Sequence, residues 1–228
     1  MIPLKDDIPS YSPPVVTVAL ISVNCLIYFY LLSLGEGFQL GLVKWGSIPF
    51  EVTHGQELTP ELSFSIPLSL FSSMFLHGGF FHLAGNMLYL WIFGDNVEDQ
   101  LGHVKFFIFY IMCGLAASLL HIFTSPNSQI PMVGASGAIA GVLGAYMIRF
   151  PKARILTLIF FGFFIRVIRV PALFVLGFWF ILQLLYALPS IGSTSGGVAW
   201  FAHVGGFLAG IVLFKLFSGF SKRRYYYD

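Results

Sequence analysis

The clearest candidate for chemistry in this sequence is Ser136, which stands in the run GASGAIAG at residues 134–141. The run is mostly glycine and alanine, so the Ser136 hydroxyl is its one reactive group. On helical spacing Ser136, Ala140 and Gly144 share a face, which predicts a helix that a neighbouring helix can approach closely. Taken alone, the run also fits a helix-packing motif with an incidental serine.

A second candidate, His203, is followed by Gly206 and Gly210 at i+3 and i+7, hence on one helical face. Small residues on both helices would let the two backbones approach until the imidazole reaches the Ser136 hydroxyl. His203 could then accept the hydroxyl proton as a general base. The alternative is a histidine that hydrogen-bonds a backbone carbonyl for packing.

Two possible hydrogen-bond donors, His82 and Asn86, lie upstream at i and i+4 and therefore share a face. Two neutral donors that converge near a serine are what an oxyanion hole requires. The alternative is a polar clamp between helices. His77 falls in the turn with Gly78 and Gly79, where we expect it to serve the fold or the outer wall of the hole.

We expect no metal and no other cofactor. His77, His82 and His203 could gather a zinc ion, but the chain has no His-Glu-x-x-His pair and no carboxylate in the outer half of any apolar run. The acids all fall in loops or tails, so a Ser-His-Asp triad is equally hard to build. A serine nucleophile would rely on a histidine alone and on the dipole at the start of its helix.

The elements that must position these residues are membrane helices. The chain is 57% hydrophobic and 10% charged, against roughly 25% charged residues in soluble domains. The net charge of +2 is not gathered on one surface, which argues against nucleic acid as a partner. Cys25 and Cys113 fall in apolar runs and are expected to be buried thiols. The N-terminus lacks the features of a signal peptide.

The predicted fold is all-α, a polytopic bundle of six transmembrane helices with a structured first loop. The spans are expected at Val15–Leu34, His82 to about Phe93, Val104–Phe123, Ser136 to about Phe150, Pro171–Leu188 and Ala199–Phe217. We expect short interfacial helices from Gly35 to about Phe75 and an acidic turn at Gly94–Asp99. The apolar patch within Pro151–Arg169 is flanked by arginines and is expected to lie in the membrane interface.

Three motifs together resemble those of the rhomboid family of intramembrane serine proteases, in the bacterial form with six transmembrane helices. The matching positions are Gly134-x-Ser136-Gly137, His203-x-x-Gly206-x-x-x-Gly210 and His82-x-x-x-Asn86. The resemblance implies that Ser136 is the nucleophile and His203 the base. It also implies an oxyanion hole made by His82, Asn86 and the Ser136 backbone N–H, with the four glycines supporting the site.

Two positions depart from the family pattern. Some members have a tyrosine four residues after the serine that stacks on the catalytic histidine, where this chain has Ala140. Many have a Trp-Arg pair in the first loop, where this chain has Trp45 followed by Gly46. The resemblance therefore leaves open how the His203 ring and the first loop are held.

The expected organisation is a tail at residues 1–14, a membrane-embedded protease domain at 15–217 and a basic tail at 218–228. With both termini in the cytoplasm, all Lys and Arg residues except Lys44 fall on the cytoplasmic side or its flanks, as the positive-inside rule favours. Ser136 and His203 then lie at similar depth in the outer half. We expect a multi-pass protein of the bacterial inner membrane whose partners are transmembrane protein substrates and the lipid bilayer.

Two other functions remain open from the sequence. A small-solute transporter would use the same intramembrane polar groups, although the spans carry no mid-membrane carboxylate or lysine. A catalytically inactive relative would bind membrane proteins without cutting them. For a protease, we expect the substrate to reach the site beside the fifth span, whose wall is formed by Phe174, Phe178, Trp179 and Phe180.

Overall fold

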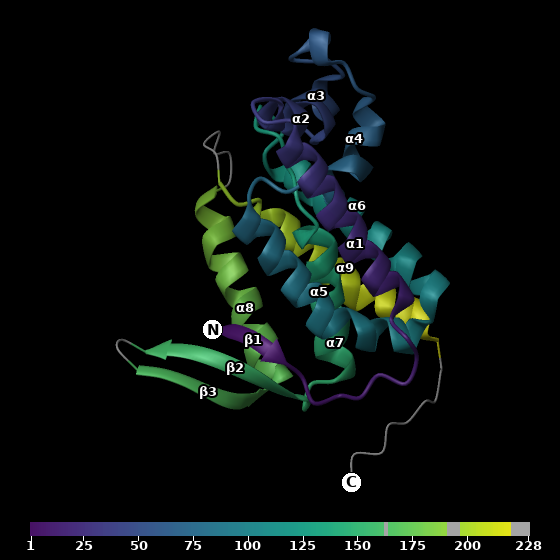
Figure 1. The fold of residues 1–228 in the computed structure, drawn as a ribbon, viewed down its shortest axis with the longest axis vertical. Coiled ribbons are helices and arrows are strands. Elements are labelled where there is room, and N and C mark those ends of the chain that lie inside the picture. The colour runs from purple at the N-terminus through teal and green to yellow at the C-terminus, as the bar shows by residue number, and fades with distance from the viewer. Residues whose placement is uncertain (162–163, 191–196, 220–228) are drawn as a thin grey trace.

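The chain folds into a helical bundle with a small β-sheet at one end (Figure 1). The structure, a computed structural model, describes residues 1–161, 164–190 and 197–219. The expected basic tail, Ser221–Arg224, and most of the Gly/Ser loop after Pro189 lie outside these residues. The elements in chain order are β1 (Ile2–Lys5), α1 (Val15–Ser33), α2 (Gly37–Trp45), α3 (Pro49–His54), η1 (Pro60–Leu62), α4 (Ile66–Ser72), η2 (Ser73–Phe75), α5 (Phe80–Leu101), α6 (His103–Thr124), α7 (Ser136–Arg149), β2 (Arg154–Phe161), β3 (Phe164–Pro171), α8 (Ala172–Ala187), η3 (Leu188–Ser190) and α9 (Trp200–Ser218).

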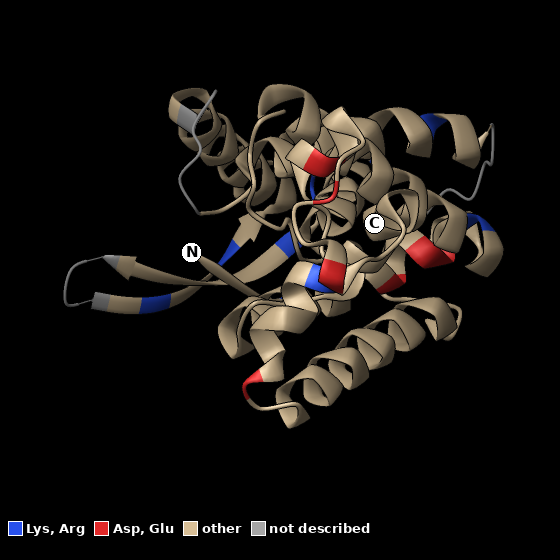
Figure 2. Cartoon of the chain, turned by 90° about the horizontal axis from the view of Figure 1, so that it is seen from above, with Lys and Arg blue, Asp and Glu red and all other residues tan. Residues whose placement is uncertain are grey.

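Each of the six predicted spans contains a helix: α1, α5, α6, α7, α8 and α9. Three of them, α1, α6 and α9, are long and apolar enough to cross a bilayer by themselves. A fourth candidate is the bent pair of residues 66–75 and helix α5, which meet at 79°. Charged residues are sparse over the helices (Figure 2). The protein is therefore a multi-pass integral membrane protein.

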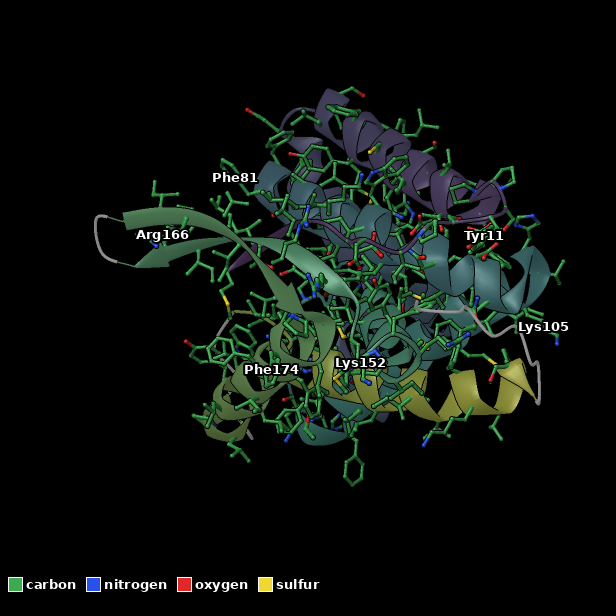
Figure 3. The ribbon with its side chains drawn as sticks, turned by 90° about the horizontal axis from the view of Figure 1, so that it is seen from below. Tyr11, Phe81, Lys105, Lys152, Arg166 and Phe174 are labelled. Atoms are coloured by element: carbon green, nitrogen blue, oxygen red, sulfur yellow. The ribbon has the colours of Figure 1, made fainter. Side chains whose placement is uncertain are left out.

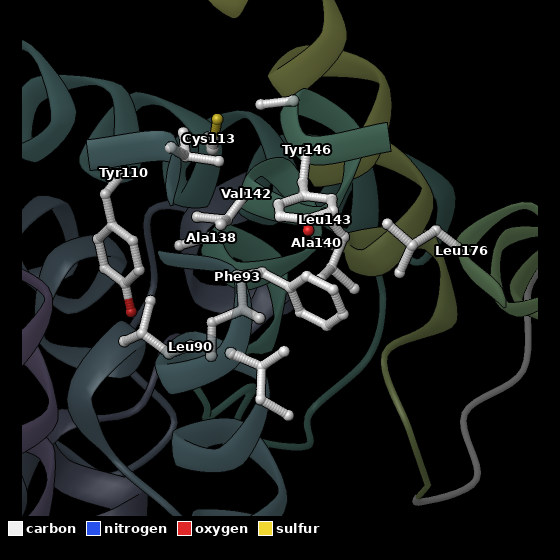
Figure 4. Packing of buried hydrophobic residues seen from close by; sticks show 14 of the residues in the cluster. Leu90, Phe93, Tyr110, Cys113, Ala138, Ala140, Val142, Leu143, Tyr146 and Leu176 are labelled. Atoms are coloured by element: carbon white, nitrogen blue, oxygen red, sulfur yellow. The ribbon is translucent and has the colours of Figure 1, made fainter. Parts of the chain in front are cut away.

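Helix α7, which begins at Ser136, lies at the centre of the bundle and packs against α5, α6, α8 and α9. Its 14 residues are too few to cross about 30 Å of hydrocarbon at 1.5 Å per residue. Every residue from Gly137 to Tyr146 is buried. Tyr146 meets Phe93 of α5 edge to face, with ring centroids 4.9 Å apart (Figure 4). The short helix is thus enclosed by longer neighbours.

The first loop contains the predicted short helices and is fastened to the segment that leads into α7. Ser47 and Met132 form a β-bridge, with backbone N–H···O distances of 3.2 and 2.8 Å. The Ser72 hydroxyl donates to the Trp45 carbonyl at 2.6 Å. Hydrogen bonds to main-chain groups therefore anchor this loop, in which Gly46 follows Trp45.

The expected acidic turn at Gly94–Asp99 is wrong, because α5 continues as a helix to Leu101. The Glu98 side chain is buried and accepts hydrogen bonds from the backbone N–H groups of Val16 at 2.9 Å and Thr17 at 2.8 Å. These amides lie in the first turn of α1, where a helix has no internal acceptor for its donors. Glu98, which was expected in a turn after the second span, therefore lies within α5 and caps the start of α1.

A three-stranded antiparallel sheet, in the order β1-β2-β3, adds to the predicted all-helical fold. Strands β2 and β3 form a hairpin from the segment expected at the interface, with Arg154 opposite Pro171 and Phe160 opposite Ile165. The N-terminal residues do not form a free tail, because β1 pairs with β2. Figure 3 shows Arg166 on the part of the hairpin that projects beyond the helices.

The segment after β1 ties the sheet to the centre of the bundle. Asp6 accepts hydrogen bonds from the Tyr146 hydroxyl of α7 at 2.5 Å and from the Asn96 amide of α5 at 3.0 Å. Asp7 accepts from the Arg154 backbone N–H at 2.8 Å. These contacts lie at the end of α7 opposite to Ser136.

Candidate active site

Ser136 occupies the first helical position of α7, so its backbone N–H has no acceptor within the helix. The chain reaches it through Gly134, whose φ of +129° is one that residues with a side chain rarely adopt. A Cβ at Gly134 would also lie 2.8 Å from His82 Nε2. Glycine is therefore required here by both the backbone conformation and the neighbouring imidazole.

His203, near the start of α9, meets Ser136 directly. The Ser136 hydroxyl and His203 Nε2 are 2.8 Å apart, a hydrogen-bond distance. The glycines of α9 make the approach possible: a Cβ at Gly206 would lie 1.9 Å from the Gly137 carbonyl oxygen, and one at Gly210 would lie 2.0 Å from that of Gly141. Helices α7 and α9 therefore touch main chain to main chain at this seam.

Ser136 and His203 both line a cavity of about 570 Å³, and His82 and Asn86 of α5 line it too. Asn86 is buried, and its Nδ2 donor is without a protein hydrogen-bond partner in the described part of the chain. A buried donor without an acceptor is costly. The structure thus brings all four polar residues named by the motifs into one cavity and leaves an amide donor free there.

His77 does not line this cavity. It is fully buried and its ring meets the His82 ring edge to face, with centroids 5.1 Å apart. Over the residues that the structure describes, no group of three or more His, Cys, Asp or Glu side chains is placed to hold a metal ion. Cys25 and Cys113 are free thiols, of which Cys113 is buried.

The residue that motif reasoning missed is Gln183 of α8. Its Oε1 lies 2.7 Å from His203 Nδ1, on the opposite side of the imidazole from Ser136. The signal in the sequence was an amide in the apolar run Pro171–Leu188, because a polar side chain within a membrane span is costly unless it is paired.

Two indole rings also flank His203, that of Trp179 from α8 and that of Trp200 from α9. The centroid of Trp179 lies 5.9 Å from that of the imidazole at an interplanar angle of 35°, and that of Trp200 lies 6.1 Å away at 89°. Ala140 lines the cavity where some family members have an aromatic ring. The imidazole is thus held from the α8 and α9 side.

The four aromatic residues expected to form one wall of α8 divide into two pairs. Phe174 and Phe178 are 66% and 48% exposed at the outside of α8, and Figure 3 shows Phe174 at that outer side. Trp179 and Phe180 face inward and pack on Phe207 of α9. Trp179 therefore cannot be replaced without disturbing the surroundings of His203.

Comparison with known proteins places the chain among rhomboids. The Rhomboid domain family model matches residues 67–220. Rhomboid protein 1, mitochondrial, of Saccharomyces cerevisiae is 32% identical over 151 residues, which is 64% of this chain and 40% of that protein. RHOMBOID-like protein 5 of Arabidopsis thaliana is 34% identical over 145 residues, 63% of this chain and 42% of its own. The chain therefore spans about two fifths of the length of these relatives.

The Rhomboid protease GluP of Bacillus subtilis is 41% identical over 78 residues, 34% of this chain and 15% of that protein. Other relatives are plant and mammalian proteins, several of them named as mitochondrial. The expectation of a bacterial type and a bacterial inner membrane is not supported by relatives that are mainly eukaryotic.

Proposed function

The chain belongs to the rhomboid family, and on that premise we propose that it is an intramembrane serine endopeptidase that cuts transmembrane proteins. The observation that carries the proposal is the 2.8 Å contact between Ser136 and His203 inside a cavity that also holds the unpartnered Asn86 amide. We place both termini on the cytoplasmic side, as the charge distribution favours.

In the first half of the reaction, the Ser136 hydroxyl attacks the carbonyl carbon of the scissile peptide and gives its proton to His203 Nε2. The carbonyl oxygen becomes an oxyanion. It is stabilised by the Ser136 backbone N–H, the Asn86 amide and the His82 ring, with the dipole at the start of α7 adding to their effect. His203 then donates its proton to the leaving amine, the C–N bond breaks, and an ester to Ser136 remains.

In the second half, a water molecule attacks the ester carbonyl while His203 accepts one of its protons. The C–O bond to Ser136 breaks, His203 returns the proton to the serine oxygen, and a carboxylic acid product leaves and gives up its remaining proton to water. Water must therefore reach a site surrounded by lipid, and the cavity of about 570 Å³ is wide enough to hold water beside the dyad.

The substrate must unwind before it reacts. A transmembrane helix holds each carbonyl in an i to i−4 hydrogen bond, and separating that bond in lipid leaves polar groups unpaired. We therefore expect substrates with glycine, proline or other weak helix formers near the cut. The residue before the cut should be small, since the space beside Ser136 is narrow: a Cβ at Gly134 would already lie 2.8 Å from His82 Nε2 and 3.7 Å from the Ser136 hydroxyl oxygen.

An activity probe tests this function. A fluorophosphonate should label the purified protein, and Ser136→Ala should abolish both the label and the cleavage of a transmembrane reporter. A reporter with Gly-Ala at the cut site should be cleaved faster than its Leu-Leu version. A folded protein that binds a membrane client but neither labels nor cuts would identify an inactive relative and refute the proposal.

A further inference from the structure

Gln183 is an amide side chain in a helix that is otherwise apolar and aromatic. Helix α8 has no charged residue, and its sequence ALFVLGFWFILQLLYA is otherwise made of apolar and aromatic residues. Gln183 is 6% exposed, so little of its side chain is open to solvent or lipid headgroups. Its two polar atoms are paired within the protein, one to the backbone of α8 and one to His203.

The orientation of the amide follows from its backbone partner. Gln183 Nε2 lies 3.2 Å from the carbonyl oxygen of Trp179, one turn earlier in α8. A carbonyl oxygen can only accept a hydrogen bond, so the NH₂ group must face it. The oxygen of the amide is then the atom that lies 2.7 Å from His203 Nδ1.

The tautomer of His203 follows in turn. The amide oxygen of Gln183 can only accept, so His203 Nδ1 must carry the hydrogen. In a neutral imidazole the other nitrogen, Nε2, then has a free lone pair. Nε2 is the atom that lies 2.8 Å from the Ser136 hydroxyl, and only a free lone pair there can accept the serine proton.

We propose that Gln183 is a positioning residue for this reaction, which holds His203 in the tautomer and orientation that accept the Ser136 proton. The inference rests on the proposed function. Gln183 has the place that a carboxylate has in a Ser-His-Asp triad, but as a neutral amide it orients the imidazole without adding a charge inside the membrane. Because Gln183 belongs to α8, that helix must be docked against α9 when the serine is activated.

The test uses the full chain with ¹⁵N-labelled histidine, and a His203→Gln spectrum identifies the His203 signals. Wild-type neutral His203 should show a protonated Nδ1 and an unprotonated Nε2. Gln183→Leu should give a mixture of both tautomers. Its kcat should fall about 10- to 100-fold with little change in KM. This is less than the roughly 10⁴-fold loss seen when an orienting residue is replaced so that the wrong tautomer forms, because leucine imposes neither tautomer.

Two further variants separate positioning from packing. Gln183→Glu keeps an oxygen acceptor and should restore both the wild-type tautomer and most of the activity. Gln183→Asn is polar but one methylene shorter. It should lose the contact as Gln183→Leu does, and it replaces that variant in the test if leucine disturbs folding.

Asn24→Leu is the matched control, since Asn24 is another buried amide, and it donates a hydrogen bond of 2.7 Å to the carbonyl one turn earlier in α1. Its kcat should equal that of the wild type.

An unchanged tautomer in Gln183→Leu, or wild-type kcat in a folded Gln183→Leu protein, would overturn the inference. Equal losses in Gln183→Leu and Gln183→Glu would overturn it as well. A wild-type protein that neither labels at Ser136 nor cuts a substrate would instead remove the proposed function, and the tautomer measurement would still report whether Gln183 orients His203.

Discussion

Gly206→Ala is the substitution whose effect on the dyad can be worked out from the structure. The new methyl group would lie 1.9 Å from the Gly137 carbonyl oxygen, whereas ordinary contact begins near 3.4 Å. The methyl group is fixed to the α9 backbone and the oxygen belongs to the α7 backbone, so no change of rotamer can relieve the clash. Helix α9 must therefore move away from α7 by about 1.5 Å near this point.

That displacement acts directly on the reacting atoms. Gly206 is three residues after His203, and the oxygen it would strike belongs to the residue after Ser136. With unchanged rotamers, a contact of 2.8 Å would open to about 4 Å, beyond hydrogen-bond range. A misplacement of about 1 Å costs on the order of 100-fold in rate, so kcat should fall about 100-fold.

The assay is cleavage of a transmembrane reporter by purified protein, with kcat taken from saturation curves and folding followed by thermal unfolding in detergent. Gly177→Ala is the matched control, because a Cβ at Gly177 in α8 meets nothing within 4 Å. It should leave kcat unchanged. If folded Gly206→Ala turned over within about threefold of wild type, the glycine seam would not set the distance between serine and histidine.

Three further predictions concern the cavity and the end of the bundle opposite to Ser136. His82→Ala and Asn86→Ala should each lower kcat by about 10- to 1,000-fold, as expected of single oxyanion donors, and a change in KM alone would assign the residue to substrate binding. Glu98→Gln should destabilise the protein by about 1–3 kcal/mol, because its NH₂ group would face the donors at the start of α1; equal unfolding temperatures in detergent would contradict this. Burial raises the pKa of Asp6 above its ordinary value, so folding favours the protonated form and that contribution is lost as pH rises through the folded pKa. Asp6→Asn should therefore gain stability relative to wild type as pH rises above about 4, the ordinary pKa of an aspartate, and a pH-independent difference in melting temperature would argue against it.

The helices of the bundle could be predicted from the sequence because the bilayer imposes a strict requirement on apolar length. The range predicted as Val15–Leu34 is helix Val15–Ser33, and the range predicted as Val104–Phe123 is helix His103–Thr124. The i+3 and i+7 spacing likewise placed Gly206 and Gly210 on the face of α9 that meets α7. On α7 the predicted face was partly wrong, because Gly137 and Gly141 meet α9 together with Gly144, while Ala140 lines the cavity. The roles of the residues at that meeting stay predictions.

The remaining features depended on partners that a local pattern does not contain. Glu98 looked like the end of a span because its partners, the first amides of α1, lie 81 and 82 residues away. The short apolar patch flanked by arginines indicated an interfacial segment and did not by itself indicate a hairpin. The run from Ile165 to Val170 is rich in β-branched residues, which is a signal for a strand. Gln183 was overlooked because an isolated amide belongs to no motif, and its partner His203 lies 20 residues further on.

The seam between α7 and α9 has a consequence for how such a protein can vary. At Gly137, Gly141, Gly206 and Gly210 both sides already carry the smallest side chain that exists. A substitution at any of these positions can only push α7 and α9 apart. A second substitution on the facing helix cannot compensate, because the facing residue is already glycine. Variation that sharpens or retunes the site must begin on the other side of His203, where Gln183 and two tryptophans, rather than main chain, set the contacts.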